Sequence, residues 1–127
     1  GWPVMFRVAG CNPPMQFMHE DDAADMLWWM IGEAPAGTFN AAGPGVVSYK
    51  EICKMAGRPC VVVPAAVLYS FVALGWRLRL VRFPAGLLDY IRYSWVADTA
   101  HMTEELGFRP RFSSRDALQD YLRASRA

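Results

Sequence analysis

The sequence predicts a helix-rich α/β fold, with α+β character, in which short strands alternate with helices. Its 127 residues, 54% hydrophobic and 20% charged, fit a single domain spanning residues 1–127 that needs neither disulfide nor metal to fold. Short apolar runs bounded by glycine and proline indicate the strands. Apolar residues at helical spacing that follow capping residues indicate the helices.

These signals place the elements along the whole chain. Capping residues, capping boxes and the proline-tolerant first turn mark where helices begin. Glycines followed by turn residues mark where helices end. The expected strands or extended segments are residues 3–9, 38–42, 60–63 and 94–97. The expected helices begin at Asp21 or Asp22, Ser48, Pro64, Leu87, Asp98 or Thr99, and Ser113.

One uncharged stretch, residues 59–76, is at the lower limit of length for a membrane-spanning helix. Pro64 divides it, because proline inside a helix removes a hydrogen bond and clashes with the preceding turn. We therefore expect a buried strand followed by a helix that runs to about Arg82.

Charge and cysteine content exclude several classes of protein. The net charge of +1 gives no overall argument for nucleic acid. Cys11, Cys53 and Cys60 form neither a C-x-x-C motif nor a zinc-site spacing, so we expect reduced thiols in a cytoplasmic protein and no metal. The segment Gly1-Trp2-Pro3 has no secretory-signal pattern, and no G-x-S-x-G nucleophile motif is present.

Two polar motifs have both structural and functional interpretations. The segment Gly43-Pro44-Gly45-x-x-Ser48 is similar to a shortened dinucleotide fingerprint, but Ser48 replaces the third glycine and an uncharged stretch replaces the ribose-binding acid. We expect a strand–helix turn there. His19 stands beside three acidic residues, which suits a general base, a metal site or a helix-capping cluster near a cleft. We favour the capping cluster.

An arginine-rich zone lies among aromatic residues in the second half of the chain. Such a zone suits a solvated face, an anionic small molecule or a nucleic acid. We favour the solvated face. The arginines are Arg77, Arg79, Arg82 and Arg92, and the aromatic residues are Trp76, Phe83, Tyr90 and Tyr93.

Several segments match, in order, motifs of a known family. Residues 16–24, QFMHEDDAA, contain an aromatic-x-His-x-x-Asp-x-Ala pattern, and residues 38–43, TFNAAG, contain an F/Y-N-x-G-like strand. Residues 96–99 and 105–110 are similar to a final Asp-x-x-K/R helix and an L-G-W/F-x-P ending, and residues 113–123 to a C-terminal helix. The chain thus resembles the C-terminal, substrate-binding part of the extended short-chain dehydrogenase/reductases, the NAD-dependent epimerase/dehydratase family.

The resemblance implies a partial Rossmann-type protein without the N-terminal cofactor half. The family's isomerase and oxidoreductase chemistry uses a Tyr-x-x-x-Lys pair and a glycine-rich NAD motif. Lys50 follows Val46 by four residues and Lys54 follows Lys50, so neither lysine has the tyrosine. We therefore expect a fragment with no catalytic and no cofactor-binding residues, which binds neither NAD nor NADP alone; whether it is an enzyme stays open.

The same resemblance implies that Gln16, His19 and Arg92 face a substrate cleft, with Gln16 and His19 bonding sugar hydroxyls and Arg92 meeting an anion. Met15 and Leu88 stand where these enzymes commonly place phosphate-binding arginines. The implied substrate is a nucleotide sugar or a less charged small molecule. We expect Asp22 and Asp98 to be structural caps.

Two other hypotheses stay open. A non-catalytic interaction or oligomerisation module would cover apolar surface near Trp28 and Trp29 by forming a homo-oligomer or a swapped dimer. A peripheral membrane protein would use residues 64–83. Our main expectation is a small-molecule ligand, with neither nucleic acid nor membrane as partner.

Overall fold

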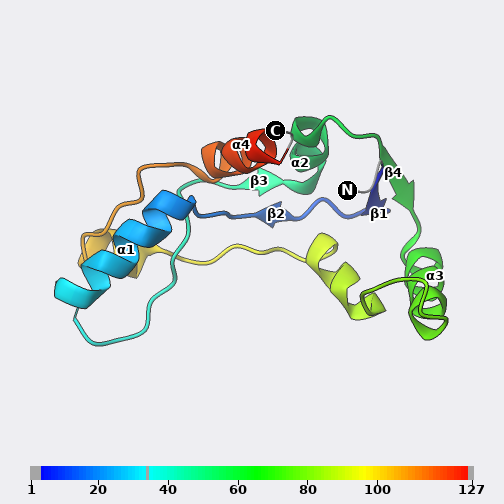
Figure 1. Ribbon diagram of the computed structural model, residues 1–127, viewed down its shortest axis with the longest axis horizontal. Helices are drawn as coiled ribbons and strands as arrows, with labels where there is room; N and C mark the ends of the chain where they lie inside the picture. The colour runs from blue at the N-terminus through cyan, green and yellow to red at the C-terminus, as the bar shows by residue number, and fades with distance from the viewer. Residues whose placement is uncertain (1–3, 34, 126–127) are drawn as a thin grey trace. The chain divides into compact units, whose positions relative to one another are not determined.

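A computed structural model describes residues 4–33 and 35–125 (Figure 1). It confirms a mixed α/β protein with short strands. The chain divides into two compact units. The first contains Gly1–Pro14 and Ser48–Trp95, and the second contains Met15–Val47 and Val96–Ala127. Each unit is described separately below.

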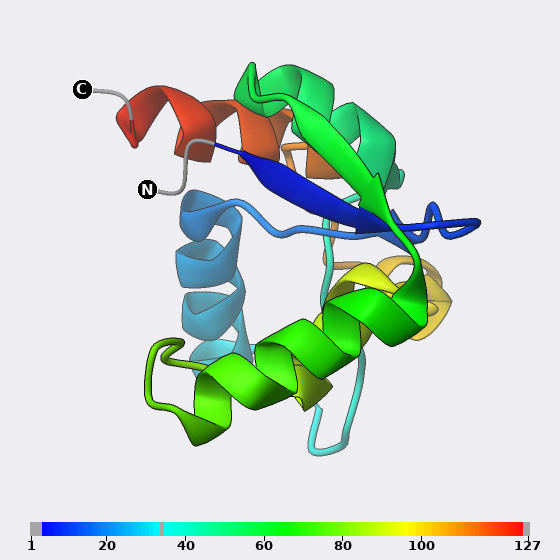
Figure 2. The same cartoon turned by 90° about the vertical axis from the view of Figure 1, so that its right-hand side faces the viewer.

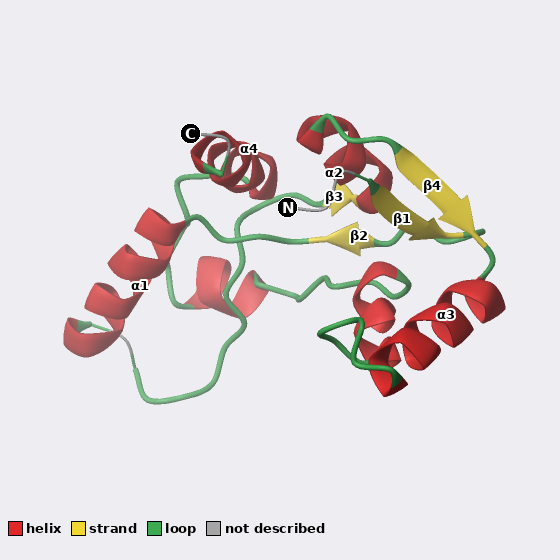
Figure 3. Cartoon of the chain, turned by 45° about the vertical axis from the view of Figure 1, so that its right-hand side comes forward, coloured by secondary structure: helices red, strands yellow, loops and turns green. Residues whose placement is uncertain are grey.

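The first unit is built on two parallel strands. Phe6 pairs with Val61 and Val8 pairs with Val63, so the strands run in register (Figures 2 and 3). The elements are the strands β1 (Met5–Val8) and β4 (Cys60–Val63), the helices α2 (Tyr49–Ala56) and α3 (Ala65–Arg77), and the 3₁₀ helix η1 (Ala85–Ile91). Pro3, where the expected first strand begins, lies outside the described residues.

Local signals fix some of the boundaries of these elements as predicted. Ser48 and Glu51 form the expected capping box at the start of α2. Gly57 ends that helix with a left-handed φ of 65°, a conformation that glycine adopts without steric cost. Pro64 separates β4 from α3, which confirms that residues 59–76 are a strand and a helix. No helix in the described part of the chain has the length and apolar character to cross a membrane.

A small apolar core holds the first unit together. Val8 of β1 is almost inaccessible to solvent and packs with buried side chains of α3 and η1, which are Leu68, Val72 and Leu88. All three cysteines are free thiols, as expected. Burial raises the pKa of Cys53 to about 12, with a further contribution from hydrogen bonding to Cys60.

The second unit contains three helical elements and long extended segments. They are α1 (Glu20–Gly32), the π-helix η2 (His101–Glu105) and α4 (Ser114–Ala124). Its buried apolar residues are Ala42, Val47, Met102, Ala117 and Leu118. The chain passes between the units within the two short paired strands, β2 (Pro14–Met15) and β3 (Val47–Ser48).

Several expectations about elements were wrong. The helix expected to begin at Asp98 or Thr99 has Ala100 as its N-cap, and the helix expected to begin at Leu87 begins at Ala85. Residues 38–42 form no strand, and the side-chain amide of Asn40 donates to the distant Asp98 carbonyl. The N-cap of α1 is His19 rather than Asp21 or Asp22. Helix α3 ends at Arg77 instead of Arg82, because the following residues fold back onto its last turn.

Candidate functional site

Gln16 is held by its side-chain oxygen. The Oε1 atom accepts the backbone N–H of Ala97 at 2.8 Å, although 81 positions separate the two residues. Within residues 4–33 and 35–125, nothing bonds the amide nitrogen of Gln16. Since the oxygen is committed to Ala97, the NH₂ group is the part of the side chain that is available to donate to a ligand.

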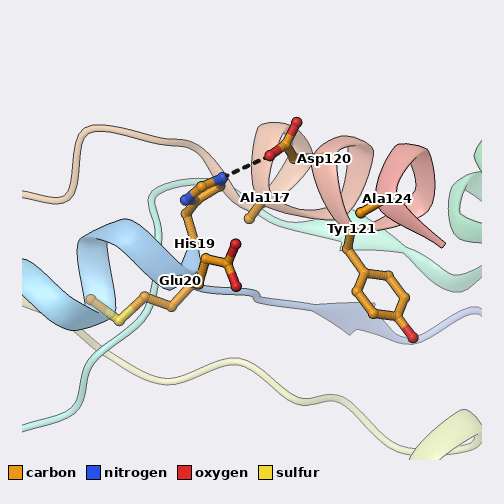
Figure 4. A pocket seen from close by; sticks show the side chains of 7 residues that line it. His19, Glu20, Ala117, Asp120, Tyr121 and Ala124 are labelled. Atoms are coloured by element: carbon orange, nitrogen blue, oxygen red, sulfur yellow. Dashed lines mark hydrogen bonds and ion pairs between the residues drawn. The ribbon is translucent and has the colours of Figure 1, made fainter. Parts of the chain in front are cut away.

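His19 is almost buried and both of its ring nitrogens are engaged. Nδ1 accepts the backbone N–H of Asp21 at 3.2 Å, which caps α1, and Nε2 lies 3.3 Å from Oδ2 of Asp120 (Figure 4). The acceptor role of Nδ1 assigns the proton of the neutral ring to Nε2, which then donates to Asp120. The ring also stacks on Phe112 at 4.1 Å. A substrate hydroxyl could bond His19 only by displacing one of these partners.

Two pockets of the second unit meet at His19. The smaller, of about 200 Å³, lies between the start of α1 and the outer face of α4 (Figure 4). The larger, of about 320 Å³, has polar walls. Its lining residues are His19, Asp21, Phe112, Asp116, Gln119, Asp120 and Arg123. Hydrogen bonds from the Ser113 hydroxyl and backbone lower the pKa of Asp116, which favours the ionised carboxylate there.

Arg92 belongs to the first unit, whereas Gln16 and His19 belong to the second. Its guanidinium lies over the rings of Tyr69 and Tyr93, with centroid distances of 5.7 and 5.2 Å. The Tyr69 hydroxyl donates to Asp89, and hydrogen bonding with Tyr69 raises the pKa of Arg92. Arg92 is thus an exposed cation ordered by two aromatic rings.

Sequence reasoning missed the long-range contacts that build the scaffold of this site. Asp22 is 1% exposed, and its carboxylate accepts the backbone N–H groups of Arg111 at 3.0 Å and Phe112 at 2.9 Å. It is therefore a structural residue, as expected, but it joins distant segments rather than capping its own helix. Asp98 does accept a local bond, from the Ala100 N–H at 2.9 Å.

Ser114 makes further long-range contacts and was not singled out from the sequence. Its fully buried hydroxyl accepts the N–H of Phe17 at 3.1 Å and lies within 3.2 Å of the carbonyls of Phe17, Gly43 and Gly45. The only signal in the sequence for this role was the presence of polar residues inside the family-like segments. Among the residues that the structure describes, no three His, Cys, Asp or Glu side chains gather as a metal site would require.

The fold and site thus define a mixed α/β protein with a polar pocket scaffolded by side-chain-to-backbone bonds. No protein-family model matches the chain, and no solved structure matches it. It is 29% identical over 121 residues to uncharacterized proteins of Mycobacterium tuberculosis (strain H37Rv) and Mycobacterium bovis, a match that covers 95% of this chain and 32% of theirs. A second uncharacterized Mycobacterium tuberculosis protein is 25% identical over 114 residues, 88% of this chain and 12% of its own. The chain spans about a third of the length of the first of these relatives.

Proposed function

We propose that these 127 residues are the substrate-binding portion of a protein of the NAD-dependent epimerase/dehydratase type, which binds a sugar-containing ligand and does not catalyse a reaction alone. The observation that carries this proposal is the set of hydrogen bonds that link the family-like segments to one another. These segments all fall in the second unit, and polar side chains of one segment bond the backbone of another.

The connections link residues far apart in the sequence. Gln16 bonds Ala97, and Asn40 bonds Asp98. Asp22 bonds Arg111 and Phe112, which directly follow the 105–110 segment. Ser114 bonds Phe17 of the 16–24 segment and Gly43 of the 38–43 segment. Polar residues that served only as local caps would bond within their own segments. Their cross-bonding supports a single scaffold whose motifs act together.

The polar pocket favours a neutral, hydroxyl-rich group over a phosphate. Asp21, Asp116 and Asp120 line it against one arginine, Arg123. Carboxylates accept hydrogen bonds from sugar hydroxyls but repel a phosphate at close range. A few convergent polar groups of this kind typically orient small ligands. We therefore expect the sugar to lie near His19, with the free amide of Gln16 as a further donor in the same unit.

Titration of the ¹⁵N-labelled protein tests this proposal. Glucose and UDP-glucose should shift amide resonances of His19 and of α4, whereas UDP and NAD should not shift them. Asp120→Asn should weaken sugar binding, because it removes an acceptor and loosens His19, whereas the exposed Glu104→Gln should not. The absence of any sugar-dependent shift, or turnover of a nucleotide sugar by this chain, would contradict the proposal.

A second candidate function, self-association, rests on the outer face of α1. Trp28 and Ile31, one turn apart, are 80% and 82% exposed, which is unusual for large apolar side chains. Light scattering distinguishes the two candidates. A dimer that dissociates in Trp28→Ser/Ile31→Ser would support an interaction module, and a monomer at micromolar concentration would exclude it.

A further inference from the structure

Charge is strongly segregated between the two units. The first unit carries eight lysines and arginines against two acidic residues, and the second carries five against ten. Their net charges of +6 and −5 nearly cancel, which explains the uninformative total of +1. Residues 52–88 contain five basic residues and not one acidic residue. The first unit therefore has a strong net positive charge, which the net charge of the whole chain does not reveal.

Helix α3, in the middle of this segment, has a second apolar side. Leu68 and Val72 face the core, while a parallel row at spacings of four, three and four residues faces solvent. This row consists of Val67, Phe71, Leu74 and Leu78, which are 58%, 76%, 57% and 58% exposed. An uninterrupted apolar row on a soluble helix indicates a contact surface.

The loop after α3 extends this apolar row and adds positive charge. The carbonyl of Gly75 accepts the N–H groups of Leu80 at 2.8 Å and Val81 at 3.2 Å, so the loop folds back against the helix end (Figure 2). A Cβ on Gly75 would lie 2.7 Å from the Val81 side chain, which shows how closely the two segments pack. Leu80, within this anchored turn, is 78% exposed. Arg77, Arg79 and Arg82 are exposed on either side of it.

We propose that this surface docks on an anionic lipid bilayer. We call it the arginine–leucine face and define it as Val67, Phe71, Leu74, Leu78 and Leu80 together with Arg77, Arg79 and Arg82. Leucine and phenylalanine side chains enter the boundary between headgroups and acyl chains, while arginines pair with lipid phosphates. Trp76, beside the face, belongs to the residue type that collects at this depth.

Charge complementarity favours the anionic bilayer over a second copy of the chain that docks through the same face. A second copy of the chain would bring like charge, +6 against +6, if it docked through the same face. A bilayer with acidic lipids presents both the apolar phase and the negative charge to one continuous surface. The proposal does not depend on sugar binding, because the pocket around His19 belongs to the other unit.

Vesicle flotation tests the proposal without interference from aggregates, which do not float. The protein should float with phosphatidylcholine/phosphatidylglycerol vesicles, float much less with phosphatidylcholine alone, and be released by high salt. Arg79→Gln/Arg82→Gln should weaken binding about 30-fold, from the contribution of two basic residues near an anionic surface. Phe71→Ser/Leu80→Ser should weaken it at least about tenfold, because the inserted apolar area is lost.

Two matched controls make the outcome decisive. Lys50→Gln/Lys54→Gln removes the same charge from exposed positions of α2 in the same unit, and Trp28→Ser/Ile31→Ser removes exposed apolar surface from α1. Both should bind vesicles nearly as the unmodified protein does, with circular dichroism confirming that all variants fold. Failure of the folded protein to float, or equal weakening in the controls, would overturn the proposal. So would a dimer, seen by light scattering, that Phe71→Ser/Leu80→Ser dissociates.

Discussion

The buried carboxylate of Asp22 accepts the backbone N–H of Phe112 at 2.9 Å and so ties the first turn of α1 to a segment 90 positions later. Its other oxygen accepts the N–H of Arg111, so one side chain satisfies two backbone donors. Because Asp22 is 1% exposed, water cannot easily replace its carboxylate as the acceptor for these two N–H groups. This pair of bonds holds together the unit that contains the candidate pocket.

Replacing Asp22 should therefore destabilise the second unit. Asp22→Asn turns one acceptor into a donor facing an N–H group and should lower the free energy of unfolding by about 2 kcal/mol or more. Asp25→Asn is the matched control, because Asp25 is 57% exposed and, among the described residues, bonds the Arg111 guanidinium alone; it should cost less than about 1 kcal/mol. Urea unfolding measures both, and equal effects would contradict the structural role of Asp22.

Gly43 should not tolerate a side chain. A Cβ there would lie 2.7 Å from the carbonyl oxygen of Phe17 and 2.9 Å from that of Phe112, and backbone atoms cannot rotate away. Gly43→Ala should destabilise the protein by about 1–3 kcal/mol. Gly37→Ala, where a Cβ meets nothing within 4 Å, should leave the melting temperature nearly unchanged. If Gly43→Ala leaves the stability unchanged, the close approach of Phe17 and Phe112 to Gly43 is not maintained in solution.

Sequence reasoning succeeded where the cause is local. The capping boxes at Ser48 and Ser113 connect residues only three positions apart, so both are readable from the sequence and both are present. It failed where the partner is distant. Residues 38–42 have strand-like composition but form no strand, and the Asn40 side chain bonds the Asp98 carbonyl, 58 positions away.

The same distinction separates the fold of the site from its chemistry. The strand–helix break at Pro64 follows from a short pattern, and the structure has it where the sequence predicts it. The strand–helix turn expected at Gly43-Pro44-Gly45 is not formed as such, because no strand precedes it. The role of Asp22 depends on two N–H groups almost 90 positions away, which no local pattern specifies. Charge segregation was likewise hidden, because the units interleave along the chain.

Gln16 allows structural and ligand-binding roles to be separated. Gln16→Glu keeps an acceptor for the Ala97 N–H but replaces the free NH₂ with a second carboxylate oxygen. It should retain near-normal stability and lose at least about tenfold in sugar affinity, the equivalent of one charged or well-oriented hydrogen bond. Gln16→Ala should lose both stability and affinity. Unchanged glucose titration of a folded Gln16→Glu would exclude Gln16 from the site.

Tyr49 should make the first unit sensitive to alkaline pH. Burial raises the pKa of Tyr49 from 10.0 to about 12, and its hydroxyl donates to the Phe6 carbonyl at 3.0 Å. Because the folded pKa is the higher one, its contribution is complete below pH 10 and is lost as the pH rises from about 10 to 12, by up to about 3 kcal/mol.

Tyr49→Phe isolates this contribution. At pH 8 the variant should be about 1 kcal/mol less stable than the unmodified protein, because the Phe6 carbonyl loses its donor. At pH 11 the difference should vanish, since only the unmodified protein must keep a buried phenol neutral there. Urea unfolding at both pH values checks this, with Tyr121→Phe, which removes a hydroxyl from a 69% exposed side chain, as the control. If Tyr49→Phe is less stable than the unmodified protein by the same amount at pH 8 and at pH 11, Tyr49 ionises as readily in the folded protein as in the unfolded one.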